Sequence, residues 1–358
     1  MPRRVAETPA DKRIDDTTGS GPFIFQRAEW RPDSRVVYVR NQRYKPRAEP
    51  PSGTGGGKVA KVDRVEWVII KDPQTQANAL TKGEVDIIEA PAYELHPTHR
   101  ANPDVQFLSI NPKGLAFWMR FNHLHPPFDN PKVRMAAMAA MNQPGFLKLQ
   151  VGIPEYSRTC FSVYPCSSPN FTQADMEFIV KPDMKRAQKL LKESGYDGTP
   201  VVLLQRTDLA AIAKLPLVAA QLLRQAGFKV DVQSMDFQTM LARLAKKDPP
   251  AEGGWNVFLA AYSAVDIMDP AVVRLMNASC EKATPGWPCD AELERLRDAY
   301  VRPQTAQERE SIAEQAQVRA MQIGTHVPLG EYVVEPAARK TIRGVFPGYL
   351  LPAWNLEK

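Results

Sequence analysis

The sequence predicts an α/β fold, in which helices pack against the faces of β-sheets. Between residues 182 and 262, apolar segments of strand length alternate with segments of helical periodicity, which is the pattern of an α/β layer. A further strand–helix–strand unit is predicted over 65–88, where Asp72 and Pro73 favour a helix start and Gly83 favours its end. The length of 358 residues is enough for two or three domains.

The other elements are predicted from local composition and from capping residues. Strands are expected where β-branched and aromatic residues concentrate, and helices where Asp, Asn or Thr caps the start or glycine marks the end. The predicted strands are 23–25, 35–39, 65–70, 85–88, 115–121, 201–205, 228–233 and 255–261. The predicted helices are 72–83, 130–142, 182–194, 212–226, 236–244, 290–300 and 305–324.

Composition excludes two classes of protein. Lys and Arg number 46 and Asp and Glu number 40, so the formal net charge is +6. That excess is too small and too scattered for a dedicated nucleic-acid binder. The purely apolar runs are only a few residues long, whereas a membrane-spanning helix needs about 20 residues. We therefore expect no nucleic-acid partner and no integral membrane protein.

The N-terminus and the cysteines give information on the cellular compartment of the protein. A secretory signal needs an apolar stretch after its basic start, and none follows here, so the protein is either cytosolic or lacks its natural beginning. The four cysteines form two close pairs, Cys160 with Cys166 and Cys280 with Cys289, and neither pair is a CxxC. We expect two disulfides, each stabilising by roughly 2–3 kcal/mol, which favours an exported protein; free thiols and a metal site are the alternatives.

Catalytic signatures are absent from the sequence. There is no GxSxG elbow and no HExxH motif. The histidine pairs His96/His99 and His123/His125 lack an evident carboxylate or cysteine partner that would complete a metal site. We therefore predict no catalytic residue, no metal and no cofactor.

One acidic segment stands out because it directly follows the predicted strand 255–261. Asp269 precedes Pro270 in the manner of a helix cap. Asp266 lies three residues earlier, at the carboxyl end of the strand, where α/β sheets bind ligands, and its carboxylate can pair with an ammonium or guanidinium group. Asp266 is the first candidate ligand-binding residue, and Tyr262 and Asn122 are the further candidates.

Seven short segments occur together in an order typical of one family. They are GSGPF (19–23), RNQRY (40–44), ALTKGEVDI (79–87), PPFDNPKVR (126–134), DIMDP (266–270), GWPCD (286–290) and WNL (354–356). In this combination the chain resembles the extracellular solute-binding proteins of family 5, the peptide- and nickel-type binding subunits of ABC importers. The resemblance covers nearly the whole chain.

The resemblance implies a two-lobed fold like that of the type II periplasmic binding proteins. Residues 1–110 with 330–358 would form lobe I, and 111–329 would form lobe II. Family members usually begin with a signal peptide and part of the first lobe, and GSGPF normally lies near mid-chain. We therefore expect a chain that is truncated at its N-terminus, with lobe I incomplete, unpaired sheet edges and exposed apolar surface. The full-length protein would be periplasmic or extracellular.

The function that the resemblance implies is capture of a solute between two lobes, followed by delivery to an ABC permease in the membrane. The ligand would be a peptide or another small amine-bearing solute, and the protein would be a monomer without enzymatic activity. Asp266 matches the aspartate that pairs with the ligand's amino terminus in peptide-binding members. Ala264 and Val265 stand where the family often has tryptophan or glycine, which puts a peptide ligand in doubt.

Two alternatives belong to other classes of function. An α/β enzyme, such as a hydrolase, would need a nucleophile, a base and an oxyanion-type donor set in one cleft. Binding of an anionic polymer through the net positive charge would need a steep dependence on salt.

Overall fold

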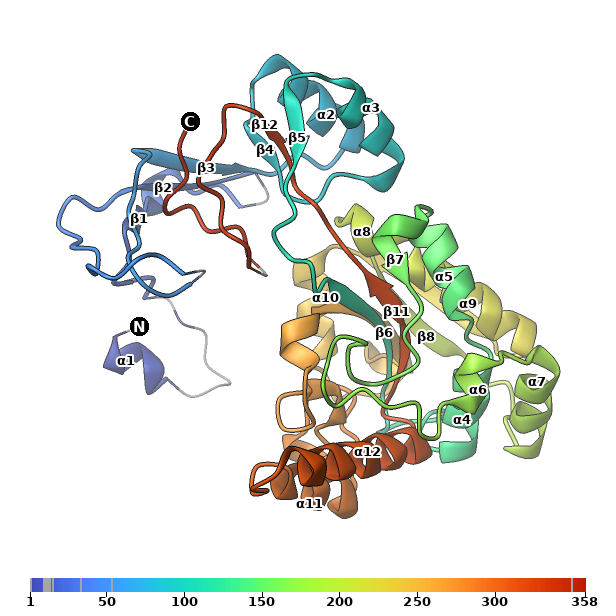
Figure 1. Ribbon diagram of the computed structural model, residues 1–358. Helices are drawn as coiled ribbons and strands as arrows, with labels where there is room; N and C mark the ends of the chain where they lie inside the picture. The colour runs from blue at the N-terminus through green and yellow to red at the C-terminus, as the bar shows by residue number, and fades with distance from the viewer. Residues whose placement is uncertain (1, 9–13, 15, 33, 53, 349) are drawn as a thin grey trace. The chain divides into compact units, whose positions relative to one another are not determined.

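The computed structural model describes residues 2–8, 14, 16–32, 34–52, 54–348 and 350–358. The chain divides into two compact units (Figure 1): unit 1 is Met1–Pro112 with Glu335–Lys358, and unit 2 is Lys113–Val334. The resemblance leads us to expect crossings between the lobes after residues 110 and 329, whereas the units change after residues 112 and 334. Among the described residues, no helix combines the length and apolar content needed to cross a bilayer.

Unit 2 is built on a six-stranded sheet with the strand order β7-β11-β6-β10-β8-β9. β6 runs antiparallel to both β10 and β11, whereas β10, β8 and β9 are mutually parallel along the sheet. The strands are β6 (Leu115–Phe121), β7 (Ser157–Arg158), β8 (Val201–Arg206), β9 (Val230–Met235), β10 (Val257–Ser263) and β11 (His326–Tyr332).

Helices cover this sheet. α5 packs on β11, α9 packs on β8 and β9, and α11 and α12 lie side by side (Figure 1). The helices of unit 2 are α4 (Pro131–Ala139), α5 (Gln143–Gln150), α6 (Glu177–Val180), α7 (Met184–Glu193), α8 (Ala210–Ala213), α9 (Leu215–Ala226), α10 (Phe237–Leu244), α11 (Ala291–Ala299) and α12 (Ala306–Ile323). On one sheet face, an apolar cluster joins β8 and β10 to α10: Val202, Leu204, Met240, Leu244, Trp255, Phe258 and Trp287.

Capping explains where most of these helices begin. Asp290 accepts a hydrogen bond from Leu293 N, and Thr305 forms the predicted capping box with Glu308. Two predicted helices differ from the helices in the structure. The helix predicted over 130–142 ends earlier, as α4 at Ala139, and Asn142 caps the separate helix α5 through Gly145 N. The helix predicted over 212–226 is divided at Lys214, between the short α8 and α9.

Unit 1 contains two three-stranded antiparallel sheets, β1-β2-β3 and β4-β12-β5. Its elements are α1 (Arg3–Ala6), β1 (Phe23–Phe25), β2 (Arg35–Arg40), β3 (Arg64–Val68), α2 (Pro73–Lys82), β4 (Ile87–Ile88), α3 (His96–Ala101), β5 (Val105–Phe107) and β12 (Ala337–Arg339). The sheet containing β12 shares a small core with α2, made of Leu80, Ile88, Val105 and Ala337.

The β1-β2-β3 sheet is covered much less than the sheet of unit 2. Among its described strand residues only Val37 is buried. Ile24, Trp67 and Val68 expose 42%, 38% and 50% of their surface. Apolar side chains on this sheet are therefore accessible to solvent.

Candidate ligand-binding site

One edge of the unit 2 sheet gathers the carboxyl ends of several strands. β8, β9 and β10 are parallel, and β11 points the same way because both β10 and β11 are antiparallel to β6. The chain enters β6 and leaves β11 at this edge, so both connections to unit 1 start here. Loops at the carboxyl ends of parallel strands are the usual ligand-binding positions of an α/β sheet.

Asp266 lies at this edge, on a 3₁₀ turn (Ala264–Ile267) that directly follows β10. Ala264 and Ile267 are buried and anchor the turn, whereas Asp266 is exposed. Ala264 N donates to Gly114 O at 3.0 Å, which ties the turn to the start of β6. Within the described part of the chain, the Asp266 carboxylate has no hydrogen-bond or ion-pair partner. Its side chain is therefore available to a ligand, on a turn that the fold holds in place.

The residues after Asp266 are also fixed by hydrogen bonds. Met268 O accepts from Ser168 Oγ at 2.7 Å and from Asn170 Nδ2 at 3.0 Å. Asp269 Oδ1 accepts from the backbone N–H groups of the next turn, at 3.0 and 3.2 Å. The predicted helix cap at Asp269 is therefore wrong in one respect, since the capped element is a turn and not a helix.

Tyr262 belongs to β10, because that strand runs two residues beyond its predicted end. Its phenol is partly buried. Burial raises the pKa of Tyr262, and the positive charges of Arg120 and Arg274 oppose that rise. Tyr262 is thus a half-buried phenol near the carboxyl end of β10.

Asn122 has the environment of a structural residue. It is fully buried, its Nδ2 donates to Trp255 O at 2.9 Å, and its Oδ1 accepts from Leu124 N at 3.1 Å. Both ends of the amide are used within unit 2, and we do not include Asn122 in the site.

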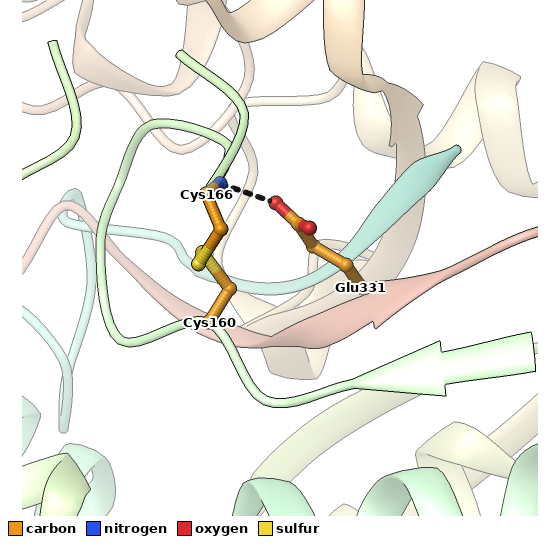
Figure 2. A group of neighbouring side chains, drawn as sticks. All are labelled: Cys160, Cys166 and Glu331. Carbon is orange, nitrogen blue, oxygen red and sulfur yellow. Dashed lines mark hydrogen bonds between the residues drawn. A yellow bond between two sulfur atoms is a disulfide. The ribbon is translucent and has the colours of Figure 1, made fainter. Parts of the chain in front are cut away.

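Both predicted disulfides are present. The Cα atoms of Cys160 and Cys166 are 5.8 Å apart and those of Cys280 and Cys289 are 4.0 Å apart. Figure 2 shows the buried Glu331 beside the first disulfide, where it accepts from Cys166 N at 2.8 Å. These three side chains are close enough to surround an ion. However, each sulfur is bonded to the other, and Glu331 is also paired with Arg158, so the group is structural.

The four histidines of the two pairs either contact backbone carbonyls or are buried. His123 Nε2 lies 3.2 Å from Gly324 O, and His125 Nε2 lies 2.7 Å from Lys247 O. His96 and His99 are both buried on α3. Burial lowers the pKa of each of these two histidines.

Comparison with known proteins identifies the family. Residues 3–284 match the family of bacterial extracellular solute-binding proteins, family 5 (middle region). The chain is 33% identical over 362 residues to a probable peptide ABC transporter periplasmic-binding protein, y4tO, of Sinorhizobium fredii, covering 100% of this chain and 68% of that protein.

Solved structures share the fold. The periplasmic binding protein DppA of Helicobacter pylori, in complex with the peptide STSA, superposes with a TM-score of 0.76 at 21% identity, over 95% of this chain and 63% of that one. AgaA of Agrobacterium tumefaciens, in complex with agropinic acid, gives a TM-score of 0.76 at 21% identity, over 94% of this chain and 66% of that one. The chain thus spans about two thirds of the length of these proteins. The predicted fold class is confirmed, and the chain belongs to family 5 of the bacterial extracellular solute-binding proteins.

Proposed function

We propose that this chain is the solute-capturing part of a periplasmic ABC importer subunit and that it performs no bond-breaking chemistry. Family membership supports a solute-binding role, and the relative y4tO is described as a probable peptide transporter component. The solute would be a peptide or another small amine-bearing molecule, handed on to a membrane permease. Unit 1 would correspond to lobe I and unit 2 to lobe II.

The observation that supports this proposal most strongly is the exposure of Asp266 and its lack of a partner among the described residues. A carboxylate that is exposed and unpaired within the described part of the chain, at the sheet edge where α/β folds usually bind ligands, is suited to an ammonium group. The turn is held by the buried residues on either side of Asp266, so little conformational freedom is lost when the charge pair forms.

The test is affinity selection from a pool of tetrapeptides, with bound peptides identified by mass spectrometry. We expect the full chain, with both disulfides formed, to retain peptides with a free amino terminus and to reject the same pool after N-acetylation. Loss of one partner of a desolvated charge pair costs about 2–5 kcal/mol, so Asp266→Asn should weaken binding by roughly 30-fold or more.

The matched control is Asp298→Asn, because Asp298 is likewise an exposed aspartate of unit 2, on α11. The Asp298→Asn variant should bind the selected peptides with the affinity of the wild type. Neither variant should have a changed melting temperature without ligand. Failure of the wild type to retain any peptide at about 100 µM, or equal retention of acetylated peptides, would overturn the proposal.

A further inference from the structure

The loop from Cys280 to Cys289, which we name the clasp loop, has exposed ends and a buried middle. Both cysteines are exposed to solvent, whereas Trp287 exposes only 5% of its surface and belongs to the apolar cluster of unit 2. The ends are joined by the disulfide and by a hydrogen bond from Cys280 N to Pro288 O at 3.1 Å. The covalent link that closes the loop is therefore accessible from solvent, although the middle of the loop is part of the core.

The buried middle of the clasp loop supplies hydrogen-bond acceptors to Arg120 of β6. Arg120 exposes 1% of its surface and forms no ion pair with a carboxylate among the residues that the structure describes. Its Nε donates to Pro285 O at 3.0 Å, and its Nη2 donates to Thr284 Oγ1 at 3.1 Å. Burial lowers the pKa of Arg120 to about 10, so the group is charged at neutral pH and depends on these acceptors. A buried charge that loses its partners is strongly destabilising.

The clasp loop connects two segments that also hydrogen-bond to each other, the chain that follows Asp266 and the helix α11. On α11, Arg297 Nε donates to Pro270 O at 3.0 Å, and Glu294 Oε1 accepts from Ala278 N at 2.7 Å. Because the disulfide links the end of the first segment to the start of the second, it restrains both. Breaking it should therefore loosen the chain that carries Asp266. A looser turn loses more conformational freedom when a solute binds, so the affinity falls.

We propose that the Cys280–Cys289 disulfide is a redox-sensitive switch, which a dithiol reductant opens and which lowers the solute affinity of the Asp266 site while it is open. A thiolate of the reductant attacks one cysteine sulfur, so the S–S bond of the protein breaks and a mixed disulfide forms. The second thiol of the reductant then breaks the mixed disulfide. In total, two electrons and two protons pass to the cysteines, and the reductant is released as a cyclic disulfide. The loss of affinity rests on the proposed function, whereas the reduction itself does not.

The Cys160–Cys166 disulfide is an internal control, because it is less accessible. Cys160 exposes 3% of its surface, and Cys166 N donates to the buried Glu331 at 2.8 Å. Thiol–disulfide exchange requires access to a sulfur atom. We therefore expect Cys160–Cys166 to be reduced more slowly than Cys280–Cys289, by about tenfold or more.

The first test follows reduction of the full chain, in which both disulfides are formed. The chain is treated with dithiothreitol, samples taken over time are alkylated with iodoacetamide, and the labelled cysteines are identified by mass spectrometry. Cys280 and Cys289 should be labelled first. At that stage amide hydrogen exchange should be faster over 264–290 and unchanged over β8 and β9. Equal reduction rates for the two disulfides, unchanged exchange over 264–290, or faster exchange throughout unit 2 would refute the switch.

The second test measures affinity and separates the inference from the proposed function. Dithiothreitol, applied long enough to reduce only Cys280–Cys289, should weaken binding of a tetrapeptide selected by the wild type by about threefold or more. It should have no effect on the Cys280→Ser/Cys289→Ser variant, which is the matched control because it lacks the switch. Unchanged affinity in the reduced wild type, or an equal loss in the variant, would refute the switch. If the oxidised wild type binds no peptide, the proposed function fails, and the labelling and exchange results still decide whether the clasp loop opens.

Discussion

Gln317 of α12 holds together the loop that supports the candidate site, and its replacement should destabilise unit 2. The side chain is fully buried. Its Oε1 accepts from Ser162 Oγ at 2.9 Å and from Val163 N at 3.0 Å, and its Nε2 donates to Thr172 O at 3.0 Å and Ala174 O at 2.9 Å. One amide thus joins both ends of the loop 162–174 to the helix.

The expected magnitude follows from these four bonds. Gln317→Met keeps a side chain of similar size, so the cost of a cavity is small. It leaves two buried groups, Ser162 Oγ and Val163 N, and two partly buried carbonyls without these hydrogen bonds. A stranded buried group costs about 1–3 kcal/mol, so the two buried groups alone give a loss of at least about 2 kcal/mol, out of the roughly 5–15 kcal/mol that stabilises a typical domain.

The assay is urea denaturation followed by near-ultraviolet circular dichroism. The control is Gln315→Met on the same helix, where the exposed amide bonds, among the residues that the structure describes, only Ser311, at 3.3 and 3.4 Å. We expect the control to lose less than about 0.5 kcal/mol. A loss below about 1 kcal/mol in Gln317→Met, or one equal to that of the control, would refute the reasoning.

The same variant should also loosen the turn that carries Asp266. Ser168 and Asn170, within the loop that Gln317 holds, donate to Met268 O, two residues beyond Asp266. Faster amide hydrogen exchange over 262–268 is therefore expected in Gln317→Met and not in Gln315→Met.

Two further predictions concern stability. Burial, reinforced by the charge of Arg120, lowers the pKa of His326 well below 6.5, so stability is complete above about pH 6.5 and falls at lower pH by up to about 1.4 kcal/mol per pH unit. Melting temperatures at about pH 7.5 and 5.5 should therefore differ less in His326→Phe than in wild type, and an unchanged difference would contradict this assignment. The Cys280–Cys289 disulfide closes a loop of sequence separation 9, which gives about 3 kcal/mol in the chain-entropy model. Replacing both cysteines with serine should lower the free energy of unfolding by about that amount, and an unshifted urea midpoint would count against it.

Local rules predicted most of the elements. Caps at Asp290 and Thr305 and the stop at Gly83 act over one helical turn, so they can be recognised in the sequence. The start of α5 also carries a local signal, since Asn142 caps it through Gly145 N, although the prediction continued the preceding helix to residue 142. The extension of β10 through Tyr262 could not be recognised, because it depends on pairing with a distant strand.

The candidate site was only partly predictable. Asp266 follows from its position after a strand together with the family resemblance. The anchoring of the segment that follows Asp266 carries no sequence signal, because it depends on a hydrogen bond to Leu275 O from Arg120, which is more than a hundred residues away in the sequence. Asn122 was a candidate from the sequence but lies in an internal hydrogen-bond network. An asparagine can bond to the protein's own backbone or to a ligand, so the residue type alone does not distinguish the two roles.

The pairing of Asp266 with the solute's amine is tested most directly by a double-mutant cycle between the two groups, measured by calorimetry. One tetrapeptide selected by the wild type is titrated with its amino terminus free and acetylated, into wild type and Asp266→Asn. We expect a coupling free energy of about 2 kcal/mol or more, so that acetylation weakens binding to wild type roughly 30-fold and hardly affects binding to the variant. Additive effects, with a coupling below about 0.5 kcal/mol, would contradict the assignment of Asp266 as the amine-binding charge.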